Sequence, residues 1–450
     1  MKKIMNKNLA EDLIKRLKSK GADQCDVMFL KSESISSSQR LGKLEKNEYS
    51  TSYEIGIRCI IGKKQSIISS SNLKKKNLLN LIDRVFDMTK IVPENNFCGL
   101  AERNQIYKFN RDDQKKLDLC DNKIPSLNNL KQSTKILEDS ALENKKISNS
   151  EGAEISWGKS SILIAGSNGL FQEYEKTVSS YILAVLAENI NSMEREFDYK
   201  SKSHFSDLGN FEKIGRNTAQ RAVRKLNSKK VKTCKTNVIF DSRVSASLIN
   251  NLASACNSSL ISRGTSFLQK KLNKQLFKTN INIIDNPNLK KGLRSKIVDC
   301  EGIKCNKQNL IKNGVLNFYF NNLEYSKQLK LESSAHASRS PSSLPFPSPT
   351  NLYLQKGNSS KKQLIQSLKK GFLITELMGS SINMSNGDYS RGASGFWIEN
   401  GEVTYPVSEV TIAGNLINIF QNMIPANDLE FNFSTNAPSC LVPNLTVAGI

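Results

Sequence analysis

The stretch "ITELMGSSINMSNGDYSRGASGFWIENGEVTYPVSEVTIAGN", residues 374–415, differs from the rest of this Lys-, Asn- and Ser-rich chain. It contains no lysine and is rich in glycine, small polar residues and aromatic side chains. Glycine allows a second backbone to approach closely, so Gly387, Gly392 and Gly395 indicate turns or close strand contacts. We therefore expect residues 387–397 to be largely buried in a strand-rich domain.

Charged and aromatic side chains lie between these glycines. Arg391 can form a forked ion pair with a carboxylate, and Asp388 and Glu376 are the candidates. The stretch is either a peptide-accepting edge or subunit seam, or a buried turn locked by an internal ion pair, which composition alone favours. The candidate residues for structural, peptide or subunit contacts are Glu376, Gly387, Asp388, Tyr389, Arg391, Gly392 and Gly395. We assign none of them as a catalytic residue or a metal ligand.

The remainder of the chain predicts three structural units. Residues 231–450 read mostly as strands and Gly-containing turns, which predicts a larger, mostly antiparallel, strand-rich C-terminal domain. Residues 1–100 and 126–230 each combine helices with strands and predict two N-terminal α/β modules, and the polar segment 101–125 predicts a linker. The predicted fold class is α+β.

Local patterns support these modules. Leu9, Leu13 and Leu17 share one face of an amphipathic helix near the start of the chain. Asn168-Gly169 lies between two strand-like segments and predicts a tight hairpin turn.

One segment, "SSAHASRSPSSLPFPSPTNLYL" at residues 333–354, contains four prolines that cannot donate to a strand ladder. It therefore predicts an extended loop. Because Phe346 and Tyr353 offer apolar side chains for docking, we expect an ordered surface loop rather than a disordered insert.

The chain carries 65 Lys and Arg against 42 Asp and Glu, a formal charge of +23. This charge fits either a nucleic-acid partner or a general composition bias. The basic residues are scattered in short runs without a nucleic-acid motif, so we favour the bias and expect no specific nucleic-acid partner.

No apolar run approaches the roughly 20 residues that span a bilayer, and the first residues lack the apolar core of a signal peptide. We expect no membrane association and a cytoplasmic location. The nine cysteines are scattered without a C-x-x-C pair, which indicates reduced thiols rather than a disulfide framework.

Catalytic motifs are sparse. The chain has two histidines, His204 and His336, whereas a catalytic zinc needs about three protein ligands. No H-E-x-x-H helix, G-x-S-x-G elbow, P-loop or Rossmann fingerprint occurs. We interpret each histidine as an ordinary polar residue.

The stretch "GFLITELMGSSINMSNGDYSRGASGFWIENGEVTYPVSEVTIAGNL" resembles the C-terminal signature of the TldD/PmbA family, and specifically its PmbA branch, also called TldE. The segments "VDCEGIKCNKQNLIKNGVLNFYFNN" and "LVPNLTVAGI" and the proline-rich segment resemble the same branch. The N-terminal segments "AGSNGLFQEYEKT" and "NSMEREFDYK" match more loosely.

The resemblance implies a zinc metallopeptidase of two related subunits, in which the TldD-type subunit carries a His-Glu-x-x-x-His helix. The corresponding place here is "INNLAS", residues 249–254, in a helix expected to end before Arg263. Ile249 and Ser254 stand where the histidines would be, and Asn250 stands where the glutamate would be. Cys440, near the place of a third ligand, has no histidine pair to join. The resemblance therefore implies no metal or other cofactor in this chain and zinc on a TldD-type partner.

The implied function is that of the non-metal-binding subunit of a TldD/TldE heterodimer that degrades or processes unfolded or short peptides. A homodimer of this chain stays open. The alternative is a non-enzymatic peptide-binding or regulatory protein, a modulator linked to DNA gyrase or to an antitoxin.

Overall fold

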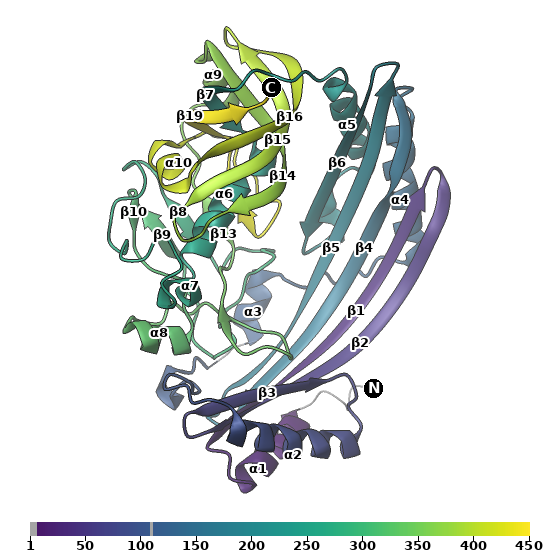
Figure 1. The fold of residues 1–450 in the computed structure, drawn as a ribbon. Helices are drawn as coiled ribbons and strands as arrows, with labels where there is room; N and C mark the ends of the chain where they lie inside the picture. The colour runs from purple at the N-terminus through teal and green to yellow at the C-terminus, as the bar shows by residue number, and fades with distance from the viewer. Residues whose placement is uncertain (1–6, 109–110) are drawn as a thin grey trace.

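The computed structural model describes residues 7–108 and 111–450 (Figure 1). The N-terminal half is built on one six-stranded antiparallel sheet with the order β3-β2-β1-β4-β5-β6. The strands are β1 (Gln24–Arg40), β2 (Lys43–Ile61), β3 (Lys64–Ser70), β4 (Ile147–Gly166), β5 (Phe171–Asn189) and β6 (Ser192–Lys202). Residues 26–39 of β1 pair with residues 153–166 of β4. The two predicted N-terminal modules therefore share a single continuous sheet.

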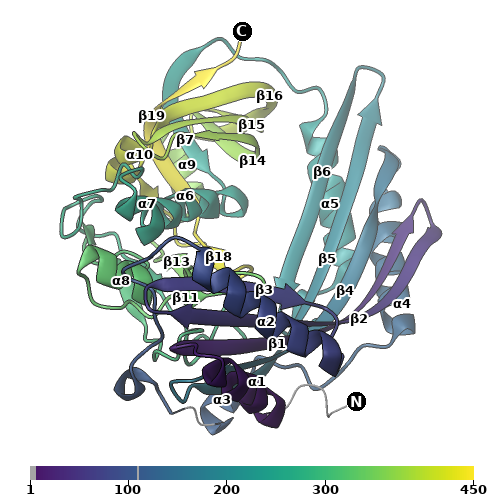
Figure 2. The same ribbon diagram turned by 60° about the horizontal axis from the view of Figure 1, so that its bottom comes forward.

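Helices pack on one face of this sheet near its two ends (Figures 1 and 2). They are α1 (Lys7–Ser19), α2 (Lys75–Ile91), α4 (Leu127–Leu142) and α5 (Phe211–Lys225). Phe29 and Ile35 point to the same face of β1 because side chains alternate along a strand. Phe29 belongs to the core under α1 and α2, and Ile35 packs on the core under α4 and α5. Each helix pair thus buries its apolar stripe against a different part of the same long strands.

The predicted linker follows the edge of β5. It contains the short helices η1 (Arg103–Gln105) and α3 (Arg111–Leu117), so it is less irregular than expected; residues 109 and 110 lie outside the described residues. The carbonyl of Leu119 accepts a hydrogen bond from the N–H of Thr177 on β5 at 2.9 Å. The exact domain boundaries stay predictions.

The C-terminal half contains a strand barrel. Its second six-stranded sheet has the order β16-β15-β14-β7-β19-β17, and β16 also pairs with β19, so that five strands close on themselves. The strands are β7 (Cys234–Phe240), β14 (Lys370–Ile382), β15 (Asp388–Glu399), β16 (Glu402–Asn415), β17 (Ile424–Pro425) and β19 (Cys440–Ala448). Only β7 and β14 run parallel within this sheet. The predicted α+β class with mostly antiparallel sheets is confirmed.

Smaller elements pack against this barrel. A five-stranded sheet consists of β8 (Ile283–Asp285), β9 (Gln308–Lys312), β10 (Val315–Leu316), β13 (Leu352–Leu354) and β18 (Thr435–Asn436). β11 (Ala337–Ser338) pairs with β12 (Phe346–Pro347). The remaining helices are η2 (Phe205–Leu208), α6 (Ser242–Ala255), α7 (Ser258–Ser262), α8 (Leu323–Leu329), α9 (Lys361–Gln366) and α10 (Leu416–Asn422). None of the helices in the described ranges is long and apolar enough to cross a bilayer.

The helix predicted to end before Arg263 is two helices. α6 ends at Ala255, and the side chain of Asn257 accepts a hydrogen bond from the N–H of Ser259 as the N-cap of α7. Asparagine competes for backbone donors, and this favours a helix start over continuation of the preceding helix.

The proline-rich segment is ordered, but the prediction of a surface loop is wrong. Residues His336, Arg339 and Pro341 are buried. His336 packs on Phe318 and Phe320 of the C-terminal half, whereas Arg339 and Pro341 lie against the N-terminal sheet. Arg339 forms an ion pair with Asp26 of β1. The carbonyl oxygen of Pro341 lies 1.9 Å from where a Cβ on Gly56 of β2 would be, so only glycine fits there. This segment joins the two halves of the molecule.

Candidate functional site

The signature stretch forms the hairpin of β14 and β15 in the barrel. Tyr389 and Trp397 are buried in the main C-terminal core. Gly387 has a φ of +84° at the turn, a conformation that other residues rarely adopt. A Cβ on Gly395 would lie 1.9 Å from the carbonyl oxygen of Leu373 on the neighbouring strand. The expectation that these glycines serve turns and close strand contacts is confirmed for Gly387 and Gly395.

The expected ion pair of Arg391 is not formed. The Nε of Arg391 donates to the carbonyl oxygen of Gly379 at 2.8 Å. Asp388 is exposed and accepts hydrogen bonds from the side chains of Asn386 and Asn415. The register of the hairpin shifts between Met378 and Ser381, and this shift places the carbonyl group of Gly379 opposite Arg391.

Gly392 also differs from expectation. A Cβ at this position would meet the Cβ of Met378 at 3.4 Å, which is ordinary van der Waals contact. Gly392 is therefore not required by space or by backbone conformation.

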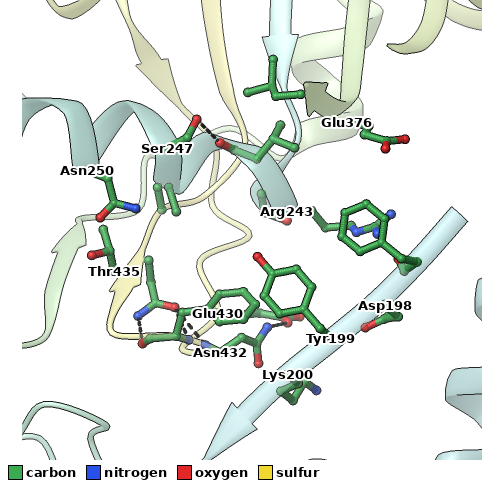
Figure 3. A pocket seen from close by; sticks show the side chains of 18 of the residues that line it. Asp198, Tyr199, Lys200, Arg243, Ser247, Asn250, Glu376, Glu430, Asn432 and Thr435 are labelled. Carbon is green, nitrogen blue, oxygen red and sulfur yellow. Dashed lines mark hydrogen bonds between the residues drawn. The ribbon is translucent and has the colours of Figure 1, made fainter. Parts of the chain in front are cut away.

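A pocket of about 660 Å³ lies between the barrel and the edge of the N-terminal sheet (Figure 3). Its walls are the exposed face of α6, residues 375–377 of β14, strand β6 and residues 430–437. Of the predicted residues, Glu376 and Arg391 line it, and Gly387, Asp388, Tyr389, Gly392 and Gly395 do not. The labelled side chains in Figure 3 come from all four walls.

A buried ion network forms the wall where the two halves meet. The Nζ of Lys225, on α5, lies 2.6 Å from Glu196 Oε2 of β6 and 2.6 Å from Glu376 Oε2 of β14. Arg243 of α6 contacts Glu196 Oε1 at 2.7 Å, and Arg221 of α5 contacts the same oxygen at 3.4 Å. Burial opposes ionisation of Glu196, but the surrounding cations, Arg243 and Lys225 first among them, lower its pKa. The network locks four elements around the pocket.

Strand β14 presents an open edge to the pocket. β7 pairs with β14 only along residues 371–374, because Asp241 ends β7 and caps α6. Beyond Ile374, β14 keeps β15 on one side and has no described strand on the other. Thr375 has no opposite residue on β15, and its buried hydroxyl has no hydrogen-bond partner in the described structure. A strand edge without a neighbouring strand can pair with an added extended chain.

The facing wall, β6, is the outer strand of the N-terminal sheet. The carbonyl oxygens of Arg195 and Phe197 point outward, since they accept hydrogen bonds from Lys225 and Arg243 at 3.2 and 2.7 Å. Backbone groups alternate in direction in an antiparallel pair, so the N–H and C=O of Tyr199 also point outward, toward the pocket that its side chain lines. Two strand edges thus flank one pocket.

The helix that would carry a metal motif also borders the pocket. Ile249 is fully buried in the barrel core, Asn250 lines the pocket, and Ser254 is exposed. An alkyl side chain cannot bind a metal, and an amide and a hydroxyl are not the histidine nitrogens that zinc prefers. These residues do not fit a zinc ion.

The thiol of Cys440 and the two histidines have other contacts. The thiol of Cys440 is buried, donates to the carbonyl of Pro438, and has a raised pKa because of burial and Asp428. His336 is buried, with Nε2 3.0 Å from Asp285 Oδ1 and Nδ1 3.0 Å from Ser334 Oγ. The Nε2 of His204 lies 3.0 Å from the carbonyl oxygen of Asp118. Within residues 7–108 and 111–450, no group of three or more His, Cys, Asp or Glu side chains is placed to hold a metal ion.

Sequence reasoning missed the residues that build the pocket walls. Glu196 and Asp198 are two residues apart on one face of an edge strand, and Arg221 and Lys225 are four apart on one helical face. This complementary spacing was the available signal, but it does not reveal that the helix and strand meet. No sequence pattern marks Thr375 as the first residue of an open edge.

Three family models match the chain: PmbA/TldA metallopeptidase domain 1 over residues 25–89, the central domain over 125–226 and the C-terminal domain over 233–449. The chain belongs to the PmbA/TldA metallopeptidase family. The metalloprotease PmbA of Escherichia coli O157:H7 is 31% identical over 96% of this chain and 94% of its own length. The metalloprotease PmbA homolog of Buchnera aphidicola (Acyrthosiphon pisum) is 30% identical over 94% of this chain and 93% of its own length. Membership of the PmbA (TldE) branch is thereby confirmed.

Solved structures share the whole fold. A candidate modulator of DNA gyrase from Bacteroides thetaiotaomicron superposes with a TM-score of 0.91 and 26% identity, covering 99% of both chains. TldE from Thermococcus kodakarensis superposes with a TM-score of 0.86 and 21% identity, covering 98% of this chain and 99% of its own. The long sheet beside a barrel is therefore an arrangement that these proteins have in common.

Proposed function

We propose that this chain is the non-metal-binding subunit of a two-subunit TldD/TldE-type zinc metallopeptidase. In that role it holds unfolded or short peptides in an extended form while the partner cleaves them. The observation that carries the proposal is the pocket between two open strand edges. It adjoins helix α6, which by the resemblance to the family corresponds to the helix of the zinc motif and carries Ile249, Asn250 and Ser254.

The geometry suits a chain that binds the peptide and leaves the catalysis to its partner. The backbone groups at Thr375 and Tyr199 can hydrogen-bond to the backbone of an extended peptide, whatever its side chains. The buried network around Lys225 and Glu196 keeps the two edges at a constant separation. Zinc on a TldD-type partner would polarise the peptide carbonyl and activate water, which the side chains present here cannot do.

The relatives support a peptidase role and a paralogous partner. Those named PmbA are called metalloproteases, and a metalloprotease TldD homolog of Buchnera aphidicola is 26% identical over 42% of this chain. Two paralogous subunits can form a heterodimer through related surfaces. A homodimer of this chain would instead pair two copies of the same surface. A cytoplasmic location and the lack of a specific nucleic-acid partner belong to this proposal.

The test is co-expression with a TldD-type partner, followed by pull-down and a peptide-hydrolysis assay. We expect hydrolysis by the complex, its loss on chelation, and none by this chain alone. The variant Asn250→Trp would fill the pocket and lower hydrolysis at least tenfold while the pull-down is unchanged. Ser254→Trp, an exposed position on the same helix outside the pocket, is the matched control and should have little effect.

The alternative is a non-enzymatic peptide-binding or regulatory protein. Structural neighbours from Bacteroides thetaiotaomicron and Thermotoga maritima are described as candidate modulators of DNA gyrase. Peptide binding by this chain, combined with no hydrolysis in any complex with a TldD-type protein, would favour the alternative.

A further inference from the structure

Three aromatic side chains lie side by side at the pocket. The rings of Phe197 and Tyr199, two residues apart on β6, have centroids 5.9 Å apart and planes inclined by 21°. The ring of Phe433, from the C-terminal half, lies 5.0 Å from that of Tyr199 and is tilted by 37°. All three line the larger pocket. This ring row of Phe197, Tyr199 and Phe433 therefore joins the two halves of the molecule along one side of the pocket.

The ring row is open to solvent. Tyr199 is 48% exposed, and Phe197 and Phe433 are half-buried. None of the three belongs to a hydrophobic core cluster of the described structure. The packing of the cores therefore does not account for these rings, and exposed aromatic side chains that gather in one place are typical of a binding surface.

A fourth ring extends this surface. Phe431 is 43% exposed and lines a second hollow of about 450 Å³, which shares Asn432 and Phe433 with the larger pocket. Exposed aromatic side chains are few among the described residues, and Tyr199 and Phe431 are two of them. Aromatic surface is thus concentrated where the two hollows adjoin.

The charges around the pocket favour neither sign. Acidic and basic side chains both line it, and two of the acids are already paired. Asp198 lies 2.6 Å from Arg221, and Glu376 lies 2.6 Å from Lys225. A mixed lining of this kind does not select peptides by net charge, which leaves apolar contact as the basis of a preference.

Tyr199 links the ring row to the open strand edge. Its backbone N–H and C=O point outward along the edge of β6, and its side chain points into the pocket (Figure 3). Residues directly opposite each other on paired strands place their side chains on the same face. A peptide that pairs with this edge therefore brings one of its side chains next to the ring of Tyr199.

We propose that the ring row is a subsite for an aromatic side chain of the bound peptide, and that this chain prefers peptides with Phe, Tyr or Trp at that position. The inference rests on the proposed peptide-binding function and adds a substrate class to it. Aromatic rings attract one another in offset and edge-to-face arrangements beyond the gain from buried area, so a peptide ring gains more here than an aliphatic side chain.

The test measures binding of three unlabelled peptides to the full chain by isothermal titration calorimetry. The peptides are Ser/Thr-rich, acetylated and amidated, and they differ only in one central residue, which is Phe, Leu or Ala. We expect the Phe peptide to bind about tenfold more tightly than the Ala peptide, with the Leu peptide between them.

Variants of two exposed tyrosines locate the effect. In Tyr199→Ala the ratio of the Phe and Ala affinities should fall close to one, whereas Tyr199→Phe, which keeps a ring, should restore a preference for the Phe peptide. Tyr49→Ala is the matched control, since Tyr49 is 68% exposed on β2, at the other side of the sheet. Its ratio should equal that of the parent.

The outcomes separate the two proposals. Equal binding of all three peptides, equal binding of the Leu and Phe peptides, or a Phe preference that survives in Tyr199→Ala would overturn the aromatic subsite and leave peptide binding intact. No binding of any peptide would overturn the proposed function and this inference with it.

Discussion

At the scale of single residues, the hairpin of β14 and β15 contains glycines with different roles. Gly395 lies where a strand carbonyl occupies the space of a side chain, whereas Gly392 has room for a methyl group. Arg391 is held by the carbonyl of Gly379 rather than by a carboxylate, and so contributes no buried ion pair.

The two glycines make a matched pair of variants. Gly395→Ala should lower the free energy of unfolding by about 3 kcal/mol, since the barrel backbone must move to admit the methyl group. Gly392→Ala should change it by less than about 0.5 kcal/mol. Urea denaturation of both variants measures this, and equal losses would show that the tight approach at Gly395 is not a constraint.

Glu196 predicts a pH dependence. Its pKa is lowered in the folded state from an ordinary value of 4.5, so its ionised form stabilises the fold above that pH. This contribution is lost as the pH falls through the lower, folded-state pKa. Glu196→Gln should therefore cost about 3 kcal/mol at pH 7, and the difference from the parent should shrink as the solution is acidified below pH 4.5. Denaturation curves at several pH values check this, with Glu212→Gln on the exposed side of α5 as the control; a difference independent of pH would contradict it.

At the scale of elements, the main feature is that strand β14 extends beyond the end of its neighbour β7. β7 stops at Phe240 because its successor, Asp241, starts α6, and β14 continues past Ile374 without a partner on that side. Sheets usually protect such edges. Here the edge faces the pocket. Under the proposed function, an extended peptide would pair with it.

Pairing along strand edges predicts a dependence on the peptide backbone. A peptide that is N-methylated at alternate residues loses the N–H groups on one of its edges, so it should bind at least tenfold more weakly than the unmodified peptide. Shifting the methyl groups by one residue blocks the other edge of the peptide, because alternate backbone groups point in opposite directions. Since the pocket has a strand edge on each side, this second peptide should also bind more weakly, and unchanged affinity of both methylated peptides would argue against strand pairing.

At the scale of the whole molecule, the two halves are joined at separate places by buried charges. Lys225 joins α5 to β14, and Arg339 joins the proline-rich segment to Asp26 of the N-terminal sheet. Buried ion pairs add little net stability, but breaking one leaves an uncompensated charge, so they favour one relative position of the two halves.

The side chains that are available as metal ligands predict that the isolated chain holds no stoichiometric zinc and cleaves no peptide. Elemental analysis after purification measures the first, and a peptide-hydrolysis assay measures the second. About one zinc per chain, lost together with activity on chelation, would mean that the metal belongs to this subunit.

The charge of +23 makes a second prediction at this scale. If it reflects composition, nucleic-acid binding should be weak, independent of sequence and absent at moderate salt. Filter binding measures this, and tight, sequence-selective binding at physiological salt would favour the regulatory alternative.

The sequence by itself determined the family, the α+β class and the burial of most of residues 387–397. Glycines, aromatics and strand-forming residues in residues 374–415 are local signals that act within one hairpin. The resemblance to the family further implies that Ile249, Asn250 and Ser254 stand at the positions of the zinc motif, and this stays a prediction.

Only the tertiary structure decided which residues meet. The partner of Glu376 is Lys225, 151 positions away along the chain, rather than the nearby Arg391. The proline-rich segment is buried because Gly56 of the other half leaves room for Pro341. The pocket and its two strand edges arise where separate elements end beside one another. Such contacts depend on packing over long sequence distances, which local residue patterns do not encode.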